Sequence, residues 1–103
     1  MSAIHERRYR LQREREIAQK RVKEATLQYV ERYENLINDL INQGLEQFVR
    51  EDIYVIQSHI SKIRSMATRN AFEARELSIQ VGQRIHALPR IARQLAQVEE
   101  KNA

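Results

Sequence analysis

Apolar residues in the C-terminal half of the chain recur at a fixed spacing of seven. One series runs from Ile53 to Leu95, and a companion series lies three residues later, from Ile56 to Val98. Two apolar positions per heptad are typical of a coiled-coil seam. We therefore predict one helix over about residues 52–100, with a seam formed by Ile53, Ile56, Ile60, Ile63, Ala67, Ala74, Leu77, Val81, Leu88, Ile91 and Leu95.

Two polar residues, Asn70 and Arg84, interrupt the companion series. Ala71 and Ile85 follow them directly and can take the inward position, so we favour an outward side chain for Arg84. For Asn70 both readings stay open, because a buried polar residue can also fix the register of a coiled coil. Pro89 predicts a kink in this helix, since proline removes a backbone bond, and the alternative is a break with a new helix starting there.

Gly44 separates this segment from a helix predicted over about residues 4–43. A glycine in the left-handed conformation at the C′ position would let Leu45 pack on Leu40, as in a Schellman-type helix stop. We expect residues 44–51 to be a connector and Asp52 to be the N-cap of the second helix.

The first helix carries one apolar stripe along its length and a second row near the connector. The stripe is Leu11, Ala18, Val22, Ala25, Tyr29, Tyr33, Leu36 and Leu40, and the second row is Val30, Ile37 and Ile41. A pair of helices needs only a narrow stripe. The wider face therefore predicts a third packing surface, from a second copy or from another protein.

These elements predict an all-α fold, with residues 1–103 forming one domain that is a long antiparallel two-helix hairpin. Folding at the connector sets Ala18 opposite Ala74 and Leu11 opposite Val81 in the seam. A two-helix hairpin has no interior, so we expect it to dimerise into a bundle or to dock on a partner.

Composition agrees with a helical chain, because 103 residues include two glycines, one proline and no cysteine. No apolar run reaches the roughly 20 residues that span a bilayer, so we expect a cytoplasmic protein without membrane contact. Charge is unevenly distributed: residues 1–24 carry net +4, residues 25–52 net −4 and residues 53–98 net +5.

Catalytic constellations are missing from the sequence. His5, His59 and His86 are far apart, although a hairpin would allow His5 and His86 to approach each other. A pair of histidines without a third ligand is weak grounds for a metal site. We therefore predict that the chain is not an enzyme and has no metal, cofactor or small-molecule ligand.

The N-terminal residues are rich in arginine and suit contact with a polyanion. The candidate residues are Arg7, Arg8, Arg10, Arg13, Arg15 and Arg21. Interleaved glutamates allow intrahelical pairs, such as Glu6 with Arg10 and Glu16 with Lys20, and would repel phosphates. We favour a solvated, ion-paired helix, with nucleic-acid binding as the alternative.

Apolar residues outside the predicted seam indicate a docking face, namely Val30, Ile37, Ile41, Tyr54, Val55, Phe72 and Ile79. We expect Tyr29 and Tyr33 to be core residues with hydroxyls at the rim. The sequence thus predicts a coiled-coil assembly or adaptor subunit that binds itself or a larger protein through apolar helix faces. The alternative is a small basic nucleic-acid-binding protein.

Overall fold

A computed structural model describes residues 3–102 of the chain; the extreme ends of the predicted 1–103 domain lie outside these residues. The described residues form helix α1 (Ala3–Asn42), a short 3-10 turn η1 (Glu46–Phe48), helix α2 (Arg50–Arg69) and helix α3 (Ala71–Asn102), with no strand among them. The prediction of an all-α fold is confirmed. The molecule is a rod with extents of 79 × 18 × 18 Å.

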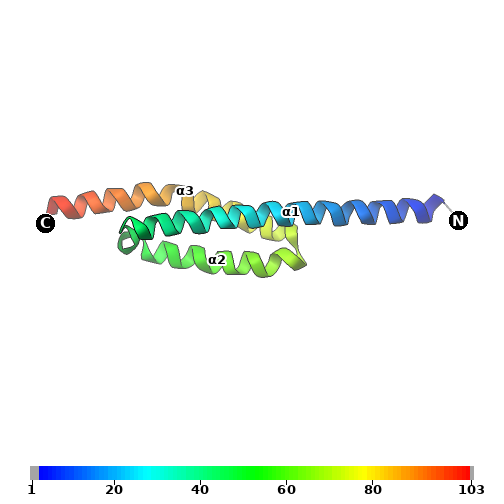
Figure 1. The fold of residues 1–103 in the computed structure, drawn as a ribbon, viewed down its shortest axis with the longest axis horizontal. Coiled ribbons are helices and arrows are strands. Elements are labelled where there is room, and N and C mark those ends of the chain that lie inside the picture. The colour runs from blue at the N-terminus through cyan, green and yellow to red at the C-terminus, as the bar shows by residue number, and fades with distance from the viewer. Residues whose placement is uncertain (1–2, 103) are drawn as a thin grey trace.

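The predicted two-helix hairpin is wrong, because the second helix ends at Arg69 and the chain reverses at Asn70. Helix α2 runs antiparallel to α1, and α3 then returns alongside both, parallel to α1 (Figure 1). The third packing surface that α1 requires therefore comes from the same chain. In place of the hairpin, residues 22–92 form a three-helix bundle.

Asn70 makes the reversal within a single residue of extended backbone, with φ −149° and ψ 87°. Its N–H donates to the Met66 carbonyl at 2.7 Å, and its side-chain Oδ1 accepts from the Glu73 N–H at 3.2 Å. Short amide side chains compete with helical hydrogen bonds in this way. Asn70 thus ends α2 and caps α3, where the sequence analysis left its role open.

The alternative of a break at Pro89 is wrong, since α3 is continuous from Ala71 to Asn102 and contains Pro89. The turn after α1 follows the prediction closely. Gly44 has φ +72°, its N–H donates to the Ile41 carbonyl, and the Leu45 N–H donates to the Leu40 carbonyl, each at 3.0 Å. This is a Schellman stop. Helix α2 starts two residues earlier than expected, so Asp52 lies in its first turn and is not its N-cap.

The core contains side chains from all three helices, and they become smaller toward the start of α3. From α1 and α2 it contains Thr26, Val30, Tyr33, Ile37 and Leu40, and Ile53, Ile56, Ile60, Ile63 and Ala67; from α3 it contains Ala71, Ala74, Ser78, Val81, Gly82, Ile85, Leu88 and Ala92. The small residues of α3 let its backbone approach α1 closely.

Part of the predicted seam faces solvent. Ile91 and Leu95 are 38% and 44% exposed, Leu77 is half-buried, and the inward positions are taken by Ser78, Ile85 and Ala92. The pairs Ala18–Ala74 and Leu11–Val81 do not form, because α3 runs away from the N-terminus of α1. The Arg84 side chain points outward as predicted, with its Nε 3.8 Å from Asp52 Oδ1, and Ile85 is fully buried.

Tyr33 sets the spacing between α1 and α3. Its hydroxyl donates to the Ser78 carbonyl at 3.1 Å in a buried contact. A Cβ atom added to Gly82 would lie 2.5 Å from the Tyr33 oxygen, so the glycine makes room for this ring. Burial is the main cause that raises the pKa of the Tyr33 phenol above its usual range, which keeps the hydroxyl protonated as a donor.

Candidate association surfaces

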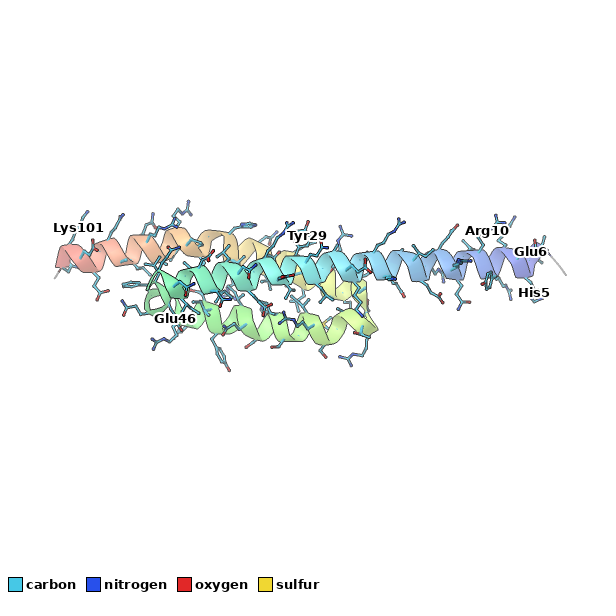
Figure 2. The ribbon with its side chains drawn as sticks, in the orientation of Figure 1. His5, Glu6, Arg10, Tyr29, Glu46 and Lys101 are labelled. Atoms are coloured by element: carbon cyan, nitrogen blue, oxygen red, sulfur yellow. The ribbon has the colours of Figure 1, made fainter. Side chains whose placement is uncertain are left out.

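The first half of α1 projects beyond the bundle as a single helix. Every residue from 3 to 21, here called the N-terminal arm, is exposed. Figure 2 shows His5, Glu6 and Arg10 at the free end of this arm, with Lys101 at the opposite end of the rod. Because all of its residues are exposed, the arm lacks the tertiary packing that supplies most of the stability of helices in proteins.

An apolar line is exposed along the arm and continues onto the bundle, where Val22 and Leu36 are partly buried and Leu36 packs against the core. It consists of Ile4, Leu11, Ala18 and Ala25 at a spacing of seven, with Val22, Tyr29 and Leu36 as the companion series. We call these seven residues the α1 stripe. Ile4, Leu11 and Tyr29 are 64%, 48% and 49% exposed. The buried face of α1 begins at Thr26, about 100° around the helix from Ala25.

The α1 stripe leads into a groove between α1 and α3. Tyr29 and Tyr33 line its α1 side, with ring centroids 6.5 Å apart, and Arg75, Ile79, Gln83 and His86 line its α3 side around Gly82. The hollow measures about 380 Å³ and is open to solvent. Phe72 lies one heptad before Ile79 on the same side of α3, and both are nearly half exposed. The groove therefore widens the α1 stripe into a broader apolar surface.

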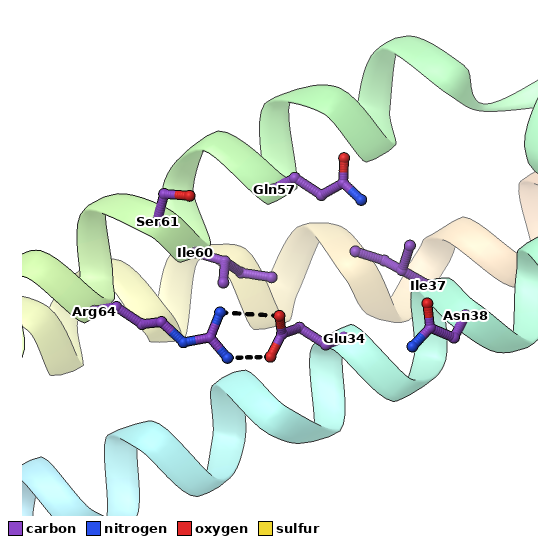
Figure 3. A pocket seen from close by; sticks show the side chains of 7 residues that line it. All are labelled: Glu34, Ile37, Asn38, Gln57, Ile60, Ser61 and Arg64. Carbon is purple, nitrogen blue, oxygen red and sulfur yellow. Dashed lines mark hydrogen bonds and ion pairs between the residues drawn. The ribbon is translucent and has the colours of Figure 1, made fainter.

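A second depression, between α1 and α2, is lined in part by an ion pair (Figure 3). Arg64 Nη1 donates to Glu34 Oε2 at 2.9 Å, and Arg64 Nη2 contacts Glu34 Oε1. The hydrogen bond to Glu34 is the main cause that raises the pKa of the Arg64 guanidinium. The two side chains are 51% and 38% exposed, so the pair aligns the helices without contributing much stability.

The last residues of α3 form a second projection. Residues 93–102, here called the C-terminal tail, pass the turn between α1 and α2 (Figure 1). Ile91, Leu95 and Val98 make an exposed line at helical spacing that continues from buried Leu88. Both ends of the rod therefore present an uncovered apolar line.

The residues of the predicted docking face lie in different parts of the structure, some in the core and some on the surface. Val30 and Ile37 are 0% and 2% exposed and belong to the core, so their assignment to a docking face is wrong. They pack in the core together with Tyr33 and Leu40, which belong to the other predicted row of this helix. Tyr54 is exposed on α2, whereas Phe72 and Ile79 border the groove on α3; Ile41 is exposed and Val55 half-buried beside the turn. Tyr29 is also more exposed than a core residue would be.

The six candidate arginines are all exposed on the arm and point in several directions around the helix. Arg8 and Arg15, seven residues apart, flank the α1 stripe, and Arg10 and Arg13 lie elsewhere. Within residues 3–102 the ion pairs are Glu34–Arg64 and Asp52–Arg84, so neither intrahelical pair expected on the arm is formed. His5 lies on the arm while His86 lines the groove, and they do not meet.

Residues 3–102 contain no group of three or more metal-ligating side chains, and none of their helices is long and apolar enough to cross a membrane. Comparison with known proteins finds no matching family model, no matching curated protein and no matching solved structure. The function must therefore be argued from the exposed surfaces themselves.

Proposed function

We propose that this chain is a non-enzymatic assembly subunit that binds another polypeptide through the α1 stripe. The observation that carries the proposal is the exposed line of Ile4, Leu11 and Ala18 on the arm, which repeats every seven residues and has no partner helix within residues 3–102. Arg8 and Arg15 occupy the companion positions of this line on the arm. A helix that presents such a line gains stability when a second helix covers it.

Surface area supports the same proposal. The accessible surface is 8061 Å² for a mass of 12.3 kDa. A compact monomer of this mass would expose about 6,100 Å². The excess of about 2,000 Å² is comparable with what each partner contributes to a large permanent interface. Covering the arm and the tail would remove most of it.

The test is affinity purification of the tagged full chain from its native cells, with half of the lysate treated with nuclease. Leu11→Gln serves as the test variant and Ile17→Gln as its matched control. Both residues are aliphatic, lie on the arm and are similarly exposed, at 48% and 45%, but only Leu11 belongs to the α1 stripe. We expect a polypeptide at fixed stoichiometry that resists nuclease, survives Ile17→Gln and is lost with Leu11→Gln. Equal loss or equal retention in both variants would contradict the proposal.

Nucleic-acid binding is the second candidate, and the observation that favours it is the set of six exposed arginines outside any ion pair of residues 3–102. Phosphate contacts release counterions, so affinity for a duplex would fall steeply as salt rises. A fluorescence titration with a labelled duplex at increasing salt measures this slope. Replacing Arg7 and Arg10 with glutamine would flatten it if the arm is the contact, and would leave it unchanged otherwise.

A further inference from the structure

We propose that the polypeptide covering the α1 stripe is a second copy of this chain, arranged antiparallel, so that each arm lies along α1 and the α1–α3 groove of the other copy. This inference rests on the proposed function and names its partner. It predicts a two-fold symmetric dimer in which the same surface of both copies forms the contact.

The spacing of the α1 stripe is self-complementary. When two α1 helices lie antiparallel with residue 20 of each at the two-fold axis, Ile4 meets Leu36, Leu11 meets Tyr29 and Ala18 meets Val22 of the other copy. Each pair occurs twice and joins an arm residue to a bundle residue. The large side chains meet toward the ends and the small ones meet at the centre. No foreign partner is needed to complete these layers.

Charge favours the antiparallel orientation over the parallel one. Residues 3–24 hold eight basic and four acidic residues, net +4, whereas residues 25–52 hold two basic and six acidic residues, net −4. The structure places the first segment mainly on the arm and the second around the turn end of the bundle. In the antiparallel register each arm lies along residues 19–37 of the other copy, which hold four basic and three acidic residues, net +1, while a parallel dimer sets the two basic arms side by side.

The groove supplies a wider contact than α1 alone. Because Tyr29 lines the groove together with Ile79, an arm that packs on Tyr29 also reaches the apolar edge of α3 formed by Phe72 and Ile79. The arm would thereby lie in contact with two helices, as each helix of the bundle does. Such packing supplies the tertiary support that a lone helix lacks.

Two layers of this register contain an arginine of the arm. Arg15 lies opposite Ala25, and the second layer is unfavourable and makes the register testable. Arg8 would lie opposite Arg32, whose guanidinium carbon lies 5.5 Å from the Tyr29 ring centroid. Replacing Arg8 with glutamate would convert this like-charge contact into an ion pair. We expect Arg8→Glu to tighten the dimer several-fold, and weaker dimerisation of this variant would overturn the register.

The orientation is tested with the full purified chain, which contains no cysteine of its own. Spin labels are attached to Lys20→Cys in one sample and to Glu6→Cys in another, and the distances between copies are measured by pulsed electron resonance. At 1.5 Å per residue, labels at residue 6 lie about 42 Å apart along the axis, whereas labels at residue 20 lie at the same level along the axis. Short distances at both positions would indicate a parallel dimer and overturn the proposal.

Sedimentation equilibrium of the wild type, Leu11→Gln and Ile17→Gln completes the test. We expect a dimer whose dissociation constant rises at least tenfold with Leu11→Gln and stays unchanged with Ile17→Gln. A wild-type chain that stays monomeric would overturn this inference, yet the proposed function would stand if the purification still recovers a Leu11-dependent partner. Failure of both experiments would reject both proposals.

Discussion

The two halves of α1 belong to one unbroken helix, yet their apolar residues have opposite surroundings. In the bundle half, Val30, Ile37 and Leu40 are at most 2% exposed, whereas in the arm Ile4 and Leu11 are about half exposed or more. Both halves show helical periodicity, so periodicity alone did not decide which residues are buried. An apolar face of this helix is therefore buried only where α2 and α3 pack against it.

The strongest way to test this comparison is to make the same kind of truncation in each half. Ile37→Ala removes a core side chain and leaves a cavity, so we expect a loss of about 2–5 kcal/mol in unfolding free energy. Ile17→Ala, on the arm and outside the α1 stripe, should change it by less than about 0.5 kcal/mol. Urea denaturation followed by circular dichroism measures both. Comparable losses would mean that the arm is packed as tightly as the bundle.

Gly82→Ala tests the close approach of α1 and α3 that makes the bundle half compact. The added Cβ would lie 2.5 Å from the Tyr33 oxygen. We expect this overpacking to lower the unfolding free energy by about 1–3 kcal/mol, partly offset by the better helix propensity of alanine. Tyr33→Phe removes the oxygen and should relieve part of the loss in the double variant. A double-mutant cycle by thermal denaturation gives the coupling, and purely additive effects would show that the two residues do not interact.

Asn70→Ala tests the reversal that brings α3 onto α1. Losing the side-chain cap of α3 should lower the unfolding free energy by about 1 kcal/mol. Asn70→Asp is the matched control, because an aspartate oxygen can still accept from the Glu73 N–H, and it should stay near the wild type. Differential scanning calorimetry of the three proteins makes the comparison. Equal melting temperatures for Asn70→Ala and the wild type would show that the cap is not needed.

Thr26→Val addresses the point where the buried face of α1 begins. The Thr26 hydroxyl oxygen is buried without a hydrogen-bond partner among the described residues. An unsatisfied buried polar group is unfavourable, so an apolar residue of the same shape should stabilise the protein by about 1 kcal/mol. Thr26→Ser keeps the hydroxyl and serves as the control. A lower melting temperature for Thr26→Val would indicate that the hydroxyl has a partner in solution, such as water.

Several parts of the fold were predictable because they depend on local chemistry. The helix stop at Gly44 follows from the conformational preference of glycine. Helical spacing explains why the isoleucines of α2 point into the core and why the Arg84 side chain points to solvent. The reversal at Asn70 also had a local signal, since Asn70 followed three residues later by Glu73 is a helix-start pattern. This helix-start pattern was not used in the prediction, because the two heptad series of apolar residues continue across Asn70.

The candidate site was only partly predictable. Of the α1 stripe, Leu11, Ala18, Ala25 and Tyr29 were assigned to an intrachain seam and Ile4 was not singled out. Val30 and Ile37 were assigned to a docking face. The structure instead leaves these four stripe residues exposed and buries Val30 and Ile37. The two faces differ by one residue in phase, so either could have been covered, and the choice depended on where α3 packs.

The helical content, the end of α1 and the inward positions of α2 could be predicted from the sequence, because they depend on side chains close together in the chain. The reversal at Asn70, the burial of Val30 and Ile37 in the core and the exposure of the arm depend on contacts between residues far apart in the chain. A cap contributes about 1 kcal/mol, which is too little to select a topology alone. Burial of three apolar faces against one another stabilises the fold by more than a cap does, and this stabilisation exists only when the whole bundle has formed.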